Sequence, residues 1–264
     1  MLHYLHDKQF HKIKGSISQK VFDKIVKKNL NKNFIYTFDD SLKSQFYLAK
    51  PILEKYNLSG IFFCNTFQFK DKFNYHELSK FFIKLCYKKK SVFYNDFLKE
   101  TKSKNLINKK KINILKKKFP FYSDNEIKIR IIRSENIHLY ELILKKLFKK
   151  KKFNFKSFQK KIFMNKSEIL KLSKKHIIGL HTHSHFFNFD KLNENIQKKE
   201  ILVNKEILEK LIKKKIIHFS YPIGKYNNIS LKLLKKFKIK FAFKNNKFYS
   251  KNLLSIPRIN INEL

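Results

Sequence analysis

An apolar run that ends in two carboxylates, Phe34-Ile35-Tyr36-Thr37-Phe38-Asp39-Asp40, constrains the fold of this chain more than any other stretch. Five consecutive apolar or β-branched side chains predict a strand buried on both faces, as in a parallel sheet that helices cover. Ligands of such sheets bind beyond the carboxyl ends of the strands, which is where Asp39 and Asp40 stand. The same two residues also suit a turn that caps a helix over 41–56. The rest of the chain has to decide between these roles.

The segment after the two acids completes a β-α-β unit. A helix pattern, which Pro51 either kinks or restarts at a first-turn position, leads to a turn over 57–60. A second apolar strand follows at Ile61-Phe-Phe-Cys64. Two strands joined by a helix are expected to be parallel, with a right-handed crossover.

The second half of the chain repeats this alternation of helix and strand. A capping box at Asn165 and Glu168 opens one of its helices. Further strands are expected at Ile177–Leu180, from Ile216 to a turn at Pro222–Gly224, at Lys240–Phe243 and near Leu254–Ile261. Such alternation predicts an α/β fold.

Residues 69–160 have a different character. Their apolar spacing predicts several helices separated by loops rich in lysine and asparagine. The two histidines there, His76 and His138, are isolated and suggest no chemistry. We therefore expect one catalytic domain over 1–264, with a helical insertion at 69–160.

The formal charge of +41 suggests nucleic acid as a partner, but the composition favours a different explanation. Lysine is spread over nearly every segment, and arginine, the better reader of bases and phosphates, occurs only at Arg130, Arg133 and Arg258. This lysine-rich, glycine-poor profile is typical of an AT-rich coding sequence. We expect no specific nucleic acid partner, and at most weak peripheral contact with an anionic membrane surface.

The ends and cysteines of the chain bear on its compartment. The N-terminus lacks a basic segment followed by an apolar one, and no uncharged stretch reaches membrane-spanning length. The two cysteines, Cys64 and Cys86, form neither a disulfide framework nor a zinc-ribbon spacing. We therefore expect a soluble cytoplasmic protein.

Three histidines follow the strand at Ile177–Leu180 within five residues. On a helical turn, the i, i+4 spacing would put His181 and His185 on one side, as in known zinc sites. With one carboxylate of the acidic pair, they form a common catalytic zinc set, which indicates metal-assisted hydrolysis. The alternative is a chance cluster on an exposed loop.

These motifs resemble a known family. In order, Thr37-Phe-Asp-Asp40, His181-Thr-His-Ser-His185 and Phe219-Ser-Tyr-Pro-Ile-Gly224 resemble the first three motifs of the polysaccharide deacetylases, carbohydrate esterase family 4. The resemblance covers 1–68 and 160–264. It implies an α/β fold, a distorted and partly open (β/α) barrel, and a hydrolase that removes acetyl groups from N-acetylated sugars.

The resemblance also implies residue roles. Asp40, His181 and His185 would bind a divalent metal ion, most simply Zn²⁺, and Asp39 would be the general base. The oxyanion would be held by the metal and by a backbone N–H near Ile223. The substrate-binding loop would comprise Tyr221, Pro222, Ile223 and Gly224, and the products would be acetate and a free amino sugar.

Two family positions differ here. The third motif usually begins with an arginine that braces the base, and this chain has Ser220 instead, so Arg258 is the expected substitute. The usual late histidine is also absent, because no histidine follows His218. Leu2-His3-Tyr4 resembles a histidine–tyrosine pair that some members carry near the start, which makes His3 the candidate general acid and His6 its competitor.

Other functions remain open from the residues alone. A catalytically inactive, sugar-binding member of the same fold would explain the two departures. A metal phosphoesterase could use the same ligand types. A basic protein that binds nucleic acid or anionic lipid is supported only by charge.

Overall fold

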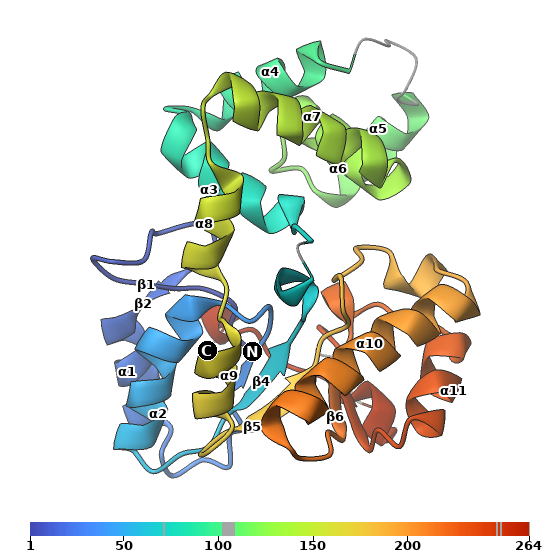
Figure 1. The fold of residues 1–264 in the computed structure, drawn as a ribbon. Helices are drawn as coiled ribbons and strands as arrows, with labels where there is room; N and C mark the ends of the chain where they lie inside the picture. The colour runs from blue at the N-terminus through green and yellow to red at the C-terminus, as the bar shows by residue number, and fades with distance from the viewer. Residues whose placement is uncertain (71, 102–108, 247, 249, 264) are drawn as a thin grey trace. The chain divides into compact units, whose positions relative to one another are not determined.

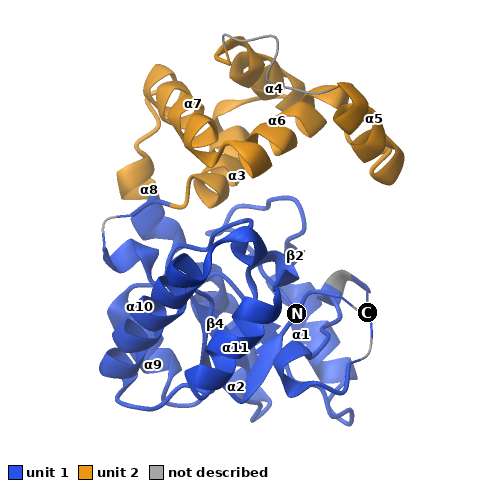
Figure 2. Ribbon diagram, turned by 90° about the vertical axis from the view of Figure 1, so that its right-hand side faces the viewer, with its two compact units in different colours: residues 1–73, 159–264 blue, residues 74–158 orange. Residues whose placement is uncertain are grey.

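The computed structural model describes residues 1–70, 72–101, 109–246, 248 and 250–263. The chain divides into two compact units (Figure 2). One comprises Met1–Phe73 and Gln159–Leu264, and the other comprises Asn74–Phe158. That the second unit is an insertion into a single catalytic domain stays a prediction.

A five-stranded parallel sheet organises the first unit (Figure 1). Each strand pairs with the next one along the chain. The strands are β3 (Thr37–Phe38), β4 (Ile61–Cys64), β5 (Ile177–Leu180), β6 (His218–Ser220) and β7 (Phe241–Phe243). A smaller parallel pair joins β1 (Leu5–His6) to β2 (Ile17–Ser18). The α/β prediction of a distorted, partly open (β/α) barrel is confirmed.

Helices lie around this sheet (Figure 1). They are α1 (Gln19–Lys28), α2 (Lys50–Lys55), α9 (Lys166–Leu172), α10 (Glu194–Ile212) and α11 (Asn228–Lys236), with a π-helical turn at Gln45–Ala49 and α8 (Phe155–Ile162) at the boundary of the units. Helical backbone continues without a break from the π-helical turn into α2, and Pro51, which has no N–H to donate, stands directly after that turn. Asn165 and Glu168 form the predicted capping box of α9.

Aromatic side chains fill the core between the sheet and the helices. The rings of Phe38 and Phe62, on neighbouring strands, stack with centroids 4.4 Å apart, and both are fully buried. Gly179 in β5 leaves room for another ring, because a Cβ there would lie 2.4 Å from Cδ1 of Phe63. Burial of this apolar area is the main stabilising contribution to the unit.

One predicted strand is wrong in extent, and another is absent from the described residues. Phe34 and Ile35 lie outside the sheet, and Ile35 is 66% exposed. Pairing with β4 begins only at Tyr36, whose carbonyl accepts the Ile61 N–H. Before Ile61 the chain consists of Gly60 and a turn, which form no strand to pair with Phe34 and Ile35. The strand expected near Leu254–Ile261 is absent among the described residues, which show a 3₁₀ turn at Leu253–Ser255 and one bridge from Ile256. Pro257 follows that bridge and has no N–H to continue a ladder.

The second unit is helical in its described residues (Figure 2). It contains α3 (Tyr75–Cys86), α4 (Lys90–Lys99), α5 (Lys109–Lys118), α6 (Asp124–Glu135) and α7 (Ile137–Lys150). Its core is also aromatic, with Phe82 packed edge-on against Phe148 at 4.7 Å. Asn74, Ser123 and Asn136 cap α3, α6 and α7.

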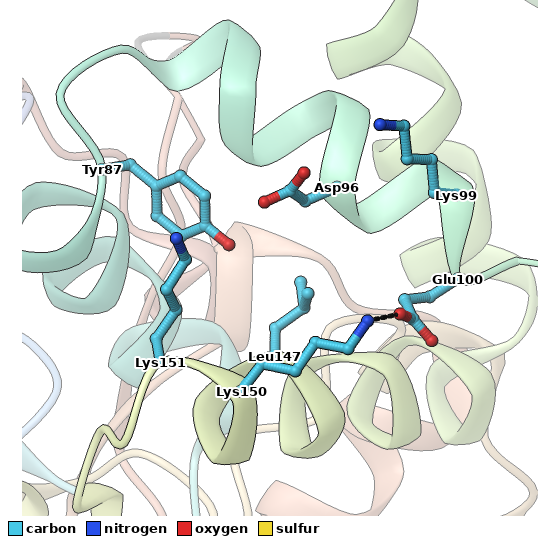
Figure 3. A pocket seen from close by; sticks show the side chains of 7 residues that line it. All are labelled: Tyr87, Asp96, Lys99, Glu100, Leu147, Lys150 and Lys151. Carbon is cyan, nitrogen blue, oxygen red and sulfur yellow. Dashed lines mark hydrogen bonds and ion pairs between the residues drawn. The ribbon is translucent and has the colours of Figure 1, made fainter.

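A cavity of about 250 Å³ opens within this helical unit (Figure 3). It is lined by Tyr87, Asp96, Lys99, Glu100, Leu147, Lys150 and Lys151. Three lysines and two acids are among these residues, and Lys150 forms an ion pair with Glu100. No helix of the described chain is both long and apolar enough to span a bilayer.

Candidate active site

The two acids stand at the carboxyl end of β3. Asp39 and Asp40 directly follow that strand, and each is only 3% exposed. The backbone turns sharply after them, because Asp40 and Ser41 are both left-handed, with φ of 78° and 56°. Asn65, just after β4, donates its N–H to Ser41 Oγ at 3.0 Å and so fixes this turn against the neighbouring strand end.

The two histidines come from the loop after β5. Nε2 of His181 lies 3.4 Å from Oδ1 of Asp40, and Nε2 of His185 lies 3.3 Å from the same oxygen. The segment between them is not a helical turn. Left-handed backbone at Thr182 and His185, with φ of 60° and 53°, bends the loop so that both rings reach one point.

These three side chains fit a divalent metal ion. Oδ1 of Asp40 is buried and accepts no hydrogen bond from the described part of the chain. Nδ1 of His181 lies 2.8 Å from the Ser220 carbonyl, so Nδ1 donates its proton there and Nε2 keeps a lone pair. Metal–ligand distances of about 2.0–2.1 Å give tetrahedral edges of about 3.3–3.4 Å, which match the two Nε2–Oδ1 distances. All three ligand atoms lie within 4.8 Å of one another.

Asp39 is held in a two-point ion pair. Nη1 of Arg258 donates to Oδ1 at 2.8 Å, and Nη2 donates to Oδ2 at 2.7 Å. Ser220 Oγ accepts from the same Nη2 at 2.9 Å and lies 3.3 Å from the carboxylate. Burial alone would raise the pKa of Asp39, but the charge of Arg258 outweighs it and holds the pKa well below its usual range. Asp39 is therefore ionised at neutral pH.

Backbone strain gathers at this end of the sheet. Left-handed φ is uncommon for residues with a Cβ, and each case costs on the order of 1–3 kcal/mol. Four of the nine described non-glycine cases lie in the three motifs, namely Asp40, Thr182, His185 and Ile223, and a fifth, Ser41, directly follows the first motif. Strain that persists at clustered positions is typical of functional sites.

His3 is the histidine with access to both acids. Its Nε2 lies 3.8 Å from an oxygen of Asp39 and 3.8 Å from one of Asp40, and its side chain is 30% exposed. No ion pair joins His6 to either acid within the described chain, and burial lowers the pKa of His6. The arrangement favours His3 over His6 as the group that meets both the site and solvent.

The loop after β6 offers one backbone donor. Tyr221 uses its N–H on the Phe243 carbonyl and its hydroxyl on the Leu254 carbonyl, so its polar groups are engaged. Ile223, with φ of 58°, has an N–H that meets no acceptor among the described residues. Gly224 also has positive φ, and a Cβ there would lie 2.5 Å from the Asn245 N atom.

Comparison with known proteins agrees with the resemblance that the three motifs indicate. Residues 140–242 match the profile of a family described as polysaccharide deacetylase. A Streptococcus pyogenes deacetylase, PplD, solved in complex with acetate, is similar over 99% of this chain and 90% of its own, with 15% identity and a TM-score of 0.57. The chain has the polysaccharide deacetylase fold.

Two other solved structures are also similar. IcaB from Ammonifex degensii covers 98% of this chain and 91% of its own, with 12% identity and a TM-score of 0.56. A de-N-acetylase from Aggregatibacter actinomycetemcomitans covers 98% and 92%, with 14% identity and a TM-score of 0.53. No curated protein sequence is significantly similar to this chain. The resemblance indicated by the motifs is confirmed.

In this fold, the side chains of Ser220 and Arg258 lie next to each other. Ser220 stands where the third motif usually has arginine, and its small side chain leaves room for the Arg258 guanidinium, which is 6% exposed. The guanidinium thus reaches the acid from the C-terminal segment instead of from β6.

Two residues of α10, neither of them predicted from the sequence, support the histidine loop. On α10, Asn204 is fully buried and accepts the His181 N–H at Oδ1 over 3.0 Å, while its Nδ2 donates to the Cys64 carbonyl at 3.0 Å. One helical turn earlier, Glu200 accepts the Ser184 N–H at 2.6 Å, and its carbonyl accepts the His183 N–H at 3.0 Å. Polar residues at i, i+4 on the apolar face of a predicted helix were the available signal.

The His183 ring makes its contact outside the group of three candidate metal ligands. Its Nδ1 lies 2.8 Å from Thr66 Oγ1, after β4, and burial with nearby lysines lowers its pKa to about 4. This agrees with its place outside the expected ligand set.

Proposed function

We propose that this protein is a metal-dependent hydrolase that removes the acetyl group from an N-acetylated sugar. The observation that carries the proposal is the geometry of five side chains. Asp40, His181 and His185 present three convergent ligand atoms, and beside them Arg258 holds a second carboxylate, Asp39, in its ionised form. The deacetylase fold supports an N-acetylated carbohydrate as the substrate class.

Asp40, His181 and His185 would hold the metal ion. Two imidazole nitrogens and one carboxylate oxygen suit Zn²⁺ and leave coordination open for other groups. When bound, the ion would lower the pKa of a water molecule and polarise the acetyl carbonyl.

The residues of the chain would perform the proton transfers. Asp39 would accept a proton from the attacking water as it adds to the carbonyl carbon. The Ile223 N–H would donate a hydrogen bond to the oxyanion that forms. His3 would give a proton to the amide nitrogen as the C–N bond breaks, which yields acetate and a free amino sugar.

The direct test is acetate release from oligomers of N-acetylglucosamine. We expect release with the zinc-loaded protein and loss of release after treatment with a chelator, with recovery when zinc is restored. Saturable binding of the oligomer without acetate release, under conditions where zinc is bound, would instead identify an inactive sugar-binding protein. Release of phosphate from phosphate esters by the same zinc-loaded protein, with no acetate release, would identify a phosphoesterase.

A further inference from the structure

Helix α5 differs from the other helices of its unit. Its ten residues, Lys109–Lys118, include six lysines and no acid, and none of them is buried. Each of α3, α4, α6 and α7 buries several apolar side chains. Helical stability in proteins comes mainly from the packing of an apolar face. Contact with a second surface would therefore supply the packing that α5 does not have within its unit.

Two large apolar side chains stand exposed on this segment. Ile114 is 65% exposed, and Phe121, in the turn just after the helix, is 71% exposed. Phe121 lies beside another ring, that of Tyr122, with centroids 4.5 Å apart. Single exposed apolar residues are common on protein surfaces, but here two of them occur on the same short basic segment.

Lysines surround the exposed isoleucine. Lys110 precedes Ile114 by four residues, and Lys117 and Lys118 follow it by three and four, so all share one face of the helix. Two acids of α6 pair with other lysines of α5, and one of these pairs joins Lys111 to Glu135. Lys116 pairs with Asp124 at 3.0 Å. The face around Ile114 therefore carries three lysines and no acid of α5.

We propose that this face, defined by Lys110, Ile114, Lys117, Lys118 and Phe121, binds the surface of an anionic bilayer. Interfacial helices combine a lysine-rich polar side with apolar side chains that enter the headgroup boundary, and both parts contribute to binding. An aromatic side chain beside the helix end suits the same boundary. A nucleic acid would use the charge alone and would leave Ile114 and Phe121 without a role.

The first experiment measures the fluorescence of an introduced tryptophan. The chain has no tryptophan, so Phe121→Trp places a single fluorophore on the proposed face. Ile35→Trp, at a site 66% exposed on the other unit, is the matched control. With phosphatidylcholine vesicles that contain about one third phosphatidylglycerol, we expect the emission of the Phe121→Trp variant to move to shorter wavelength. The Ile35→Trp emission should stay unchanged, and neither variant should respond to pure phosphatidylcholine.

The second experiment separates this face from the general charge of the chain. Lys117→Glu with Lys118→Glu should lower the vesicle partition coefficient at least about tenfold. Lys235→Glu with Lys236→Glu, at exposed positions on α11, changes the net charge equally and should leave partition nearly unchanged. Circular dichroism confirms that each pair of changes leaves the fold intact.

Three results would overturn the proposal. Equal losses from the two lysine pairs would mean that only net charge matters. An unshifted Phe121→Trp emission on vesicles that do bind the protein would place the contact elsewhere. Salt-sensitive binding to duplex nucleic acid that falls with the α5 pair, without any response to vesicles, would assign the face to nucleic acid.

Discussion

Arg258 and Asp39, 219 residues apart in sequence, form a two-point ion pair with N–O distances of 2.8 and 2.7 Å. Both side chains are almost fully buried. Removal of one partner would leave a buried charge uncompensated, which typically costs about 3–5 kcal/mol.

Arg258→Met should therefore destabilise the protein by about 3–5 kcal/mol in chemical denaturation. Arg130→Met is the matched control, because Arg130 pairs with Glu126 in a partly exposed i, i+4 bridge and should cost about 1 kcal/mol or less. Equal losses in the two variants would contradict the role assigned to burial of the Arg258–Asp39 pair.

Arg258→Lys keeps a positive charge but loses the fork geometry, and it tests the pH dependence of the proposed reaction. Arg258 lowers the pKa of Asp39 against the effect of burial. A weaker partner lets that pKa rise, so Asp39 gains a proton at a higher pH than in the wild type. The acid limb of the acetate-release profile should shift to higher pH. An unmoved limb, with lower activity at every pH, would mean that Arg258 acts in another way.

Asp39→Asn should separate metal binding from proton transfer. The amide keeps the shape of the side chain but cannot serve as a base, so acetate release should fall about 10²–10⁴-fold. Bound zinc should stay stoichiometric, since Asp39 is not among the three convergent ligand atoms. Loss of zinc together with activity would place Asp39 in the metal site instead.

Asn204→Ala should weaken metal binding without touching a ligand. Asn204 positions the His181 backbone, and loss of such outer contacts typically lowers metal affinity about 10–100-fold. Asn193→Ala is the matched control on the same helix, because it removes the N-cap of α10 and should cost about 1 kcal/mol of stability. Zinc titration should show a change for Asn204→Ala only. Equal effects on affinity would reduce Asn204 to a general stabilising residue.

His176 predicts a contribution to acid sensitivity that is separate from the site. Its Nδ1 accepts the Gly60 N–H at 3.2 Å, which requires a neutral ring, and burial lowers its pKa despite Glu54 nearby. The unfolded chain therefore binds this proton more readily than the folded one, starting below a pH of about 6.5. Stability should fall as pH drops below that value, by up to about 1.4 kcal/mol per pH unit.

His176→Asn keeps an acceptor for Gly60 but does not titrate, so denaturation curves between neutral and mildly acidic pH should show a smaller slope. His11→Asn, at an exposed position, should leave the slope unchanged. An identical pH dependence in wild type and His176→Asn would refute this contribution.

The sequence predicted most of the architecture because strand and helix patterns here are local. The strands at Ile61–Cys64 and Ile177–Leu180 were placed correctly, since continuous apolar runs between turns identify buried strands. Phe34 and Ile35 were misplaced because apolar character does not reveal whether a pairing partner extends that far. The apolar residues around Arg258 predict a strand, but Pro257 has no N–H to contribute to a ladder there.

The candidate site, too, could be predicted from the sequence only in part. The residue types of Asp40, His181 and His185 could be read from their motifs, and the structure brings these side chains together. The left-handed turn of the histidine loop could not be read, because a β-branched residue such as Thr182 rarely adopts positive φ. Nor could the contact of Asn204 with the His181 backbone, which depends on how α10 packs against the sheet.

The most direct test of the account is the zinc content of the purified protein after dialysis against zinc and then against buffer. We predict one zinc ion per wild-type chain, and loss of that ion in both Asp40→Ala and His181→Ala. His138→Ala, at an exposed histidine of the second unit, should keep it. Stoichiometric zinc that survives both ligand substitutions would contradict the central claim that Asp40, His181 and His185 form the metal centre.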